Sequence, residues 1–229
     1  MLTLSWDFNL LANYSELWIS GIWLTLWLST GVIIFGTLLA CLLVTGLKVR
    51  IKLLHWLCRA YIDLFRAIPP LVLLGTLYFL LPSLLGGVVL GATTIALIVL
   101  SLNLAPFAAE CIRAGFESIP TVQYESAKVL GFTGWRLLYY IILPQVVRRI
   151  LPPLSGQWVT SLKLTSLAAT IGVPEIWHVT GVVVTDTSLP IEARLIGAGL
   201  YVAIILPCLL GVLYMERQFN VKGFGITNQ

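Results

Sequence analysis

Long runs without a charged side chain constrain this chain more than any other feature. Between Glu16 and Lys48 lie 31 uncharged residues, and between Arg66 and Glu110 lie 43. About 20 apolar residues suffice for a helix to cross about 30 Å of hydrocarbon. Only 10% of the 229 residues are charged and 59% are hydrophobic, whereas soluble domains carry about 25% charged residues. The sequence therefore predicts an all-α integral membrane protein, and it disfavours a soluble enzyme, a nucleic-acid binder and a disulfide scaffold.

Five membrane-spanning helices account for the apolar runs. The 43-residue run is too long for one helix, and the turn-type cluster at residues 82–87 divides it. The stretch from Ile150 to Gly172 is mostly apolar but contains Lys163, and a last apolar run precedes Glu216. The predicted spans are 17–46, 60–82, 88–112, 150–172 and 194–215, within a single transmembrane domain over residues 1–229.

The basic residues predict which side of the membrane each end faces. All 14 Lys and Arg except Lys163 and Arg194 follow the first, third or fifth span. The positive-inside rule places these segments in the cytoplasm, so the N-terminus lies outside and the C-terminus inside. The predicted outer segments carry acidic residues, and tryptophans fall near the predicted interfaces. These acidic residues are Asp7, Glu16, Glu175, Asp186 and Glu192, and the tryptophans include Trp6, Trp135 and Trp177.

A polar segment over residues 117–149 separates the third and fourth spans. At 33 residues it is long for a connector. Thr121 is placed to cap a helix over 121–130, and Gly131 is placed to end it. A basic amphipathic stretch follows over 134–149. Two interpretations fit these residues: an amphipathic helix that rests on lipid headgroups, or a docking surface for a cytosolic partner.

The polar segment carries a spaced motif that resembles the EAA motif of ABC importer permeases. Ser126 replaces the usual Ala, and Val122 replaces a usual Gly. The resemblance implies a short coupling helix near residues 120–131 that docks in a groove of the ATP-hydrolysing subunit. The motif positions are Glu125, Ser126, Ala127, Gly131, Ile141, Leu143 and Pro144.

Other segments extend the resemblance over most of the chain. Residues 61–71, 100–113 and 163–167 are similar, in order, to segments of polar amino acid permeases of the histidine/glutamine type. The resemblance implies a type I ABC importer permease with five transmembrane helices in the bacterial cytoplasmic (inner) membrane. It also implies ATP-binding subunits, a second permease chain (identical or similar) and an extracytoplasmic solute-binding protein that delivers an amino acid.

No cofactor is expected in this chain itself. It has no P-loop, so ATP and Mg are expected in the partner ATPase and this subunit is not an enzyme. A membrane-embedded enzyme would need a convergent set of acid, base or metal groups within the spans. An ion-gradient-driven secondary transporter is the other alternative, and it would work without an associated ATPase.

Lys163 is the charge least expected from the membrane pattern. It lies about 13 residues into the fourth predicted span, roughly 20 Å along a helix. An ionisable group at that depth usually faces a cavity or a partner, unless the span is shifted and the lysine snorkels outward. In the resembling family this segment lines the substrate site, which implies that Lys163 attracts the carboxylate of an amino acid. Thr165 and Ser166 would add hydroxyl groups, or would instead bond their own helix carbonyls.

Three further positions bear on the site. Leu164 stands where the family has Asp, which weakens the case for a cationic amino acid. Two interpretations stay open: the substrate is an uncharged or acidic amino acid, or this chain is the non-substrate-binding half of a heterodimeric permease. Asn103, in the third span, fits an interhelical hydrogen bond or a substrate contact. Glu110 and Arg113, three residues apart, are predicted to form an ion pair that fixes the helix.

Overall fold

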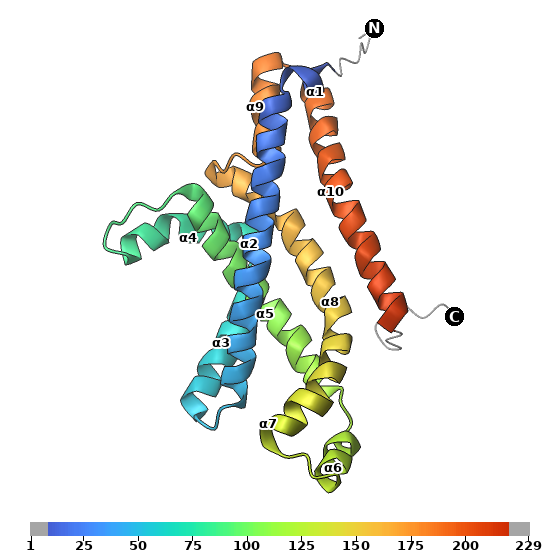
Figure 1. Cartoon of the computed structure of the whole chain (residues 1–229). Coiled ribbons are helices and arrows are strands. Elements are labelled where there is room, and N and C mark those ends of the chain that lie inside the picture. Colours follow the sequence, from blue (N-terminus) through green and yellow to red (C-terminus); the bar gives the residue numbers. More distant parts are fainter. Residues whose placement is uncertain (1–8, 220–229) are drawn as a thin grey trace.

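The computed structural model describes residues 9–219, and every regular element in that range is helical (Figure 1). Asp7, Lys222 and Trp6, which entered the topology prediction, lie outside the described residues. The elements are α1 (Leu10–Asn13), α2 (Ser15–Lys48), α3 (Lys52–Ala67), α4 (Pro70–Leu84), α5 (Ala92–Glu117), α6 (Thr121–Val129), α7 (Gly134–Arg136), the π-helical η1 (Leu137–Ile142), α8 (Leu143–Leu164), the 3-10 helix η2 (Thr165–Ile171), α9 (Ile176–Thr187) and α10 (Pro190–Phe219).

The predicted all-α membrane architecture is confirmed, but the number of spans depends on how bent helices are counted. Among the described residues, α2, α5 and α10 are each long and apolar enough to cross a membrane. Two bent pairs also qualify: α3 with α4, and the run from Gly134 to Ile171 with α9. Five spans result only if each bent pair counts as one. Figure 1 shows α6 and α7 at one end of the molecule and α1 with the α9–α10 turn at the other.

The second predicted span, 60–82, is not a straight helix. The chain turns by 112° between α3 and α4, and α4 projects sideways from the long axis in Figure 1. Ile68 and Pro69 are extended, with ψ of 127° and 135°. A residue before proline avoids helical geometry, so the Pro69-Pro70 pair ends α3 and lets Pro70 start α4. The predicted turn after α4 is confirmed by positive φ at Gly86 and Gly87.

The fourth predicted span, 150–172, has different ends in the structure. Helix α8 already begins at Leu143, and Pro152 and Pro153 lie inside it rather than at a helix start. At Thr165 the helix tightens into η2, which ends at Gly172 in a left-handed conformation (φ 82°). After a 45° bend, α9 continues the apolar path to Thr187. Lys163 therefore sits near the end of α8, at the point where the span is broken.

Close packing of α2 against α5 forms the centre of the core. Leu28 and Val32 of α2 are fully buried, as is Ala108 of α5. A Cβ on Gly36 would lie 2.9 Å from the Leu104 side chain, so the absence of a side chain allows the two helices to approach. Small residues commonly provide such contacts between membrane helices.

An ion-pair network holds α3 against α5. The predicted pair is confirmed, since the Arg113 Nη2 lies 2.6 Å from the Glu110 Oε2. Two arginines of α3 join it: Arg59 Nη1 lies 3.3 Å from the Glu110 Oε1, and Arg66 Nη1 lies 4.0 Å from it. Arg59 also pairs with Asp63 at 2.9 Å. One carboxylate thus faces three guanidinium groups, and one of them, from Arg66, lies in the last turn of α3 just before the bend.

Removal of the Glu110 charge is expected to loosen this junction. Glu110→Gln should destabilise the purified chain by about 1 kcal/mol, because a network retains more energy than an isolated surface pair. Asp63→Asn is the matched control. The Asp63 side chain is 53% exposed and, within the described part of the chain, pairs only with Arg59, so this variant should change stability by less than about 0.5 kcal/mol. Thermal unfolding in detergent measures both. Equal effects of the two variants would contradict a central role for Glu110.

Candidate functional site

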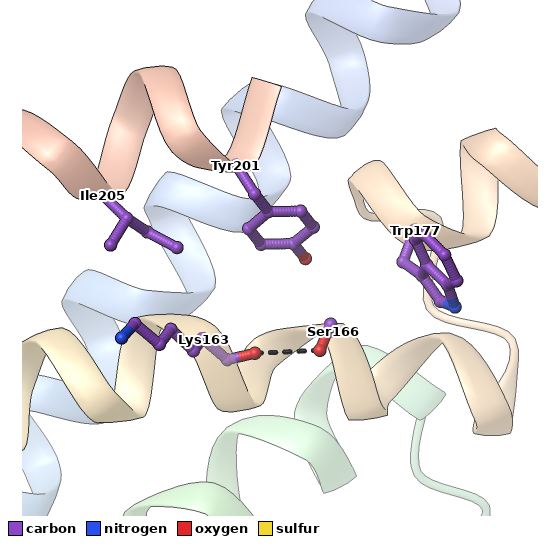
Figure 2. Close-up of a pocket in the computed structure, with 5 residues that line it drawn as sticks. All are labelled: Lys163, Ser166, Trp177, Tyr201 and Ile205. Atoms are coloured by element: carbon purple, nitrogen blue, oxygen red, sulfur yellow. Dashed lines mark hydrogen bonds between the residues drawn. The ribbon is translucent and has the colours of Figure 1, made fainter. Parts of the chain in front are cut away.

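A pocket of about 360 Å³ opens beside the break in the fourth span. Its lining comes from four elements (Figure 2): Lys163 lies in the last turn of α8, Ser166 in η2, Trp177 in the first turn of α9, and Tyr201 and Ile205 one turn apart on α10. The polar groups are an ammonium, two hydroxyls and an indole N–H, and the remainder is apolar. This combination suits a small ligand with one anionic end.

The Lys163 ammonium has no partner within the part of the chain that the structure describes. No ion pair or side-chain hydrogen bond involves it, and the residue is exposed in the single chain. In Figure 2 the side chain runs along the pocket toward Ile205 and away from Trp177. Its place near the C-terminal end of α8 favours a cation, because the last carbonyls of a helix carry partial negative charge. The geometry therefore offers a free cation to a ligand.

The other residues expected at the site are only partly brought together. Ser166 lines the pocket, and its Oγ donates to the Lys163 carbonyl at 2.8 Å. Thr165 is fully buried and its Oγ1 donates to the Leu162 carbonyl at 2.7 Å. Both hydroxyl protons are thus used within the helix, which leaves only oxygen lone pairs for other contacts. Leu164 packs against the main core cluster and does not line the pocket.

Asn103 lies apart from the pocket. It is 3% exposed on α5, and its Nδ2 makes no hydrogen bond to any described residue. The expected interhelical hydrogen bond from this amide nitrogen is therefore absent. The side chains packed around α5 at this level are mainly apolar, and the alternative of a substrate contact at Asn103 stays a prediction.

Glu175 is a functional candidate that the sequence prediction misplaced. It was assigned to an outer polar segment, but it is fully buried at the start of α9. Its Oε1 accepts the His178 N–H at 2.9 Å, and its Oε2 accepts the Tyr201 hydroxyl. The carboxylate thereby caps α9 and ties it to α10 behind the pocket. Glutamate is not among the residues preferred at this position, so the local sequence carries no clear signal for the cap.

Helix α6 occupies the position predicted for the coupling helix. It begins directly after Pro120, and Thr121 provides no side-chain cap, so the predicted cap is wrong. Gly131, with φ of 83°, follows the end of the helix as predicted. Val122 is 62% exposed in the first turn, so the helix forms without the usual Gly at that position.

One face of α6 is packed and the other is free. Ala127 is 3% exposed and packs with Ile119, Leu137 and Ile142, which join α6 to η1 and α8. Glu125 and Ser126 are exposed, and neither side chain forms a hydrogen bond or ion pair with the described residues. Apolar side chains next to them also remain uncovered: Val129 is 88% exposed, Leu130 75% and Trp135 69%. A short rigid helix with this free face is suited to contact a separate protein.

Comparison with known proteins decides the family. The family model described as "Binding-protein-dependent transport system inner membrane component" matches residues 32–218. The chain belongs to this family. The prediction of a permease subunit from an importer is confirmed, and the alternatives of an ion-gradient-driven transporter and a membrane enzyme lose their support.

Individual relatives of this permease agree with the family. It is 39% identical over 158 residues to the probable amino-acid ABC transporter permease protein YckA of Bacillus subtilis, covering 69% of each chain. It is 29% identical to the probable glutamine ABC transporter permease protein GlnM of the same species, covering 93% of this chain and 97% of GlnM. A crystal structure of an amino acid ABC transporter with histidines matches with a TM-score of 0.86 and 28% identity, covering 94% of this chain and 100% of that one.

Proposed function

We propose that this permease carries an amino acid through an ABC importer and that the pocket at Lys163 holds the amino acid during translocation. The similar permeases and the similar structure are named for amino acid transport. The observation that carries the proposal is the unpartnered Lys163 ammonium in a pocket at the break of a membrane span. A cation within a membrane-spanning segment is costly without a partner, and the carboxylate of an amino acid would offset that cost.

The charges around the pocket favour a substrate without a positive side chain. Lys163 is the charged residue in the lining, and Leu164 replaces the Asp of the resembling family. The nearby Glu175 carboxylate already accepts the His178 N–H and the Tyr201 hydroxyl. A charge-assisted hydrogen bond from the ammonium would hold the α-carboxylate, whereas a cationic side chain would meet repulsion. The proposed substrate is therefore an amino acid with an uncharged or acidic side chain.

Helix α8 gives a direct mechanical route from the coupling helix to the pocket. Helix α6 packs on η1, which continues into α8, and α8 ends beside Lys163. The 22 residues of α8 span about 33 Å at about 1.5 Å per residue. ATP-driven closure of the partner subunits would push on α6, tilt α8 and change the side from which the pocket is open. Hydrolysis would then reset the arrangement.

The complete importer requires further chains. The free face of α6 would dock on one of two ATP-binding subunits, which bind ATP and Mg. A second permease chain, identical or similar, would complete the pathway, and an extracytoplasmic binding protein would deliver the amino acid. The complex would lie in the bacterial cytoplasmic membrane with the N-terminus outside and the C-terminus inside. Basic residues in α6, α7 and the first two turns of α8 support this orientation; they are Lys128, Arg136 and Arg148.

A substrate screen tests the proposed charge class. The purified complex in lipid nanodiscs, with its binding protein, is supplied with uncharged, acidic or basic amino acids, and ATP hydrolysis is measured. We expect stimulation by an uncharged or acidic amino acid and none by lysine or arginine, because Lys163 repels a second cation. Stimulation by basic amino acids alone would contradict the substrate assignment. Failure of an ATP-binding subunit to co-purify with the intact chain would contradict the importer assembly.

A further inference from the structure

Trp177 lies between two pockets. Besides the Lys163 pocket, it lines a second cavity of about 570 Å³ along η2 and α9. The second cavity, called the outer pocket below, is lined by Thr170, His178, Thr185 and Asp186 among others. Under the proposed topology the outer pocket faces the extracytoplasmic side, because α9 runs from the break in the span toward the α9–α10 turn.

The two pockets are neighbours along η2 and share Trp177 as a lining residue. Ser166 lines the Lys163 pocket and Thr170 lines the outer pocket, and the two residues are four positions apart in η2. In Figure 2 the Trp177 side chain stands at the end of the Lys163 pocket that is farther from the ammonium. A molecule that moves along this surface from the outer pocket to Lys163 would pass the indole, which lines both pockets.

Hydrogen bonds hold the backbone on both sides of Trp177, whereas its indole is held by none among the described residues. On one side, the Ile176 N–H donates to the Thr25 Oγ1 at 3.3 Å, and on the other, the His178 N–H donates to the Glu175 carboxylate. The indole itself is 43% exposed and donates no hydrogen bond to the described residues. An anchored main chain with an unbonded aromatic side chain permits a change of rotamer without unfolding of α9.

The charges of the two pockets match the two ends of a zwitterion. The outer pocket carries the Asp186 carboxylate together with the His178 ring, and the Lys163 pocket carries an ammonium. An amino acid that approaches from outside would keep its ammonium toward Asp186 and turn its carboxylate toward Lys163. We propose that Trp177 is the outer gate of this permease: it closes the Lys163 pocket toward the outside, and its rotation admits the amino acid. This inference rests on the proposed function and assigns a gate to the same site.

A cysteine-accessibility experiment tests the gate. Cys41, Cys58, Cys111 and Cys208 are first replaced by alanine in the complete complex in right-side-out membrane vesicles. Ser166→Cys then reports on the Lys163 pocket, and Thr170→Cys is the matched control in the outer pocket. Each cysteine variant is prepared once with the native Trp177 and once with Trp177→Ala. The probe is a membrane-impermeant sulfonated thiol reagent added outside, and the rate of labelling of this chain is measured.

The gate predicts different results for the two cysteines. At position 170, labelling should be fast with either residue at position 177. At position 166, labelling should be slow with Trp177 and at least about tenfold faster with Trp177→Ala. Equal rates at position 166 would overturn the proposal, and so would slow labelling at position 170, because the outer pocket would then not open outside. Labelling does not require transport. The gate can therefore be tested even if the substrate screen contradicts the proposed function.

A second arm keeps the test valid if Trp177→Ala does not assemble. With Trp177 intact, the binding protein together with ATP and vanadate should hold the complex open to the outside. Labelling at position 166 should then accelerate to the rate found at position 170. A rate that does not change under these conditions, with normal ATPase inhibition by vanadate, would show that the indole does not gate the pocket. Trp177 would then be interpreted as an aromatic side chain that anchors α9 at the membrane interface.

Discussion

Valine in place of Gly131 is expected to lower binding-protein-stimulated uptake by about tenfold or more. Gly131 has φ of 83°, and no atom lies within 4 Å of a Cβ built there. The cost is therefore conformational strain rather than a clash, and a β-branched residue in this region costs about 1–3 kcal/mol. Relief of that strain would reorient the chain after α6 and misplace the coupling helix. Uptake and ATP hydrolysis by the purified complex measure the effect.

Gly131→Asn is the matched control for this prediction. Asparagine adopts the left-handed conformation more readily than other residues with a side chain, so uptake should stay within about threefold of the native level. Co-purification of the ATP-binding subunit shows whether each variant still assembles. Native uptake and native ATPase stimulation in an assembled Gly131→Val complex would contradict the coupling role of this segment.

Alanine in place of Lys163 is expected to weaken the response to substrate strongly. A hydrogen bond to a charged group contributes about 1.5–3 kcal/mol, so the amino acid concentration for half-maximal uptake should rise about tenfold to about a hundredfold. The exposed side chain has no partner among residues 9–219, so the stability of the chain should change little. Initial uptake rates over a range of amino acid concentrations measure the effect.

Two variants separate charge from general damage at the pocket. Lys163→Arg keeps the cation and should retain most of the affinity. Ser166→Ala should have a small effect, because the Ser166 proton is already donated to the Lys163 carbonyl. A Lys163→Ala complex with native half-maximal concentration would place the substrate elsewhere, as expected if this chain is the non-substrate-binding half of a heterodimer.

Features that depend on neighbouring residues could be predicted from the sequence. The end of α6 near Gly131 follows from a glycine that accepts positive φ, and the Glu110–Arg113 pair follows from helical spacing. The membrane architecture follows from composition. The arginines of α3 that join the pair could not be predicted, since Arg59 is 51 positions away from Glu110.

Features that depend on packing between distant segments were missed. The predicted span 60–82 is defined by its length, although its charged residues precede Pro69-Pro70 and uncharged residues follow the pair. The size of the bend, 112°, could not be predicted from this change. Glu175 was interpreted as an outer charge because a carboxylate in a membrane protein usually lies at the surface. Its burial depends on Tyr201, which approaches from α10. Trp177 could be predicted only as an interfacial aromatic, because its place between two pockets requires the bend before α9.

Amino acid uptake into proteoliposomes that contain the complete complex tests the central claim most directly. The vesicles hold ATP and Mg inside, the binding protein and a radiolabelled uncharged amino acid are outside, and ionophores collapse all ion gradients. The account predicts uptake that requires both ATP and the binding protein and that survives the ionophores. Uptake that is abolished by the ionophores, or that proceeds without ATP, would contradict it.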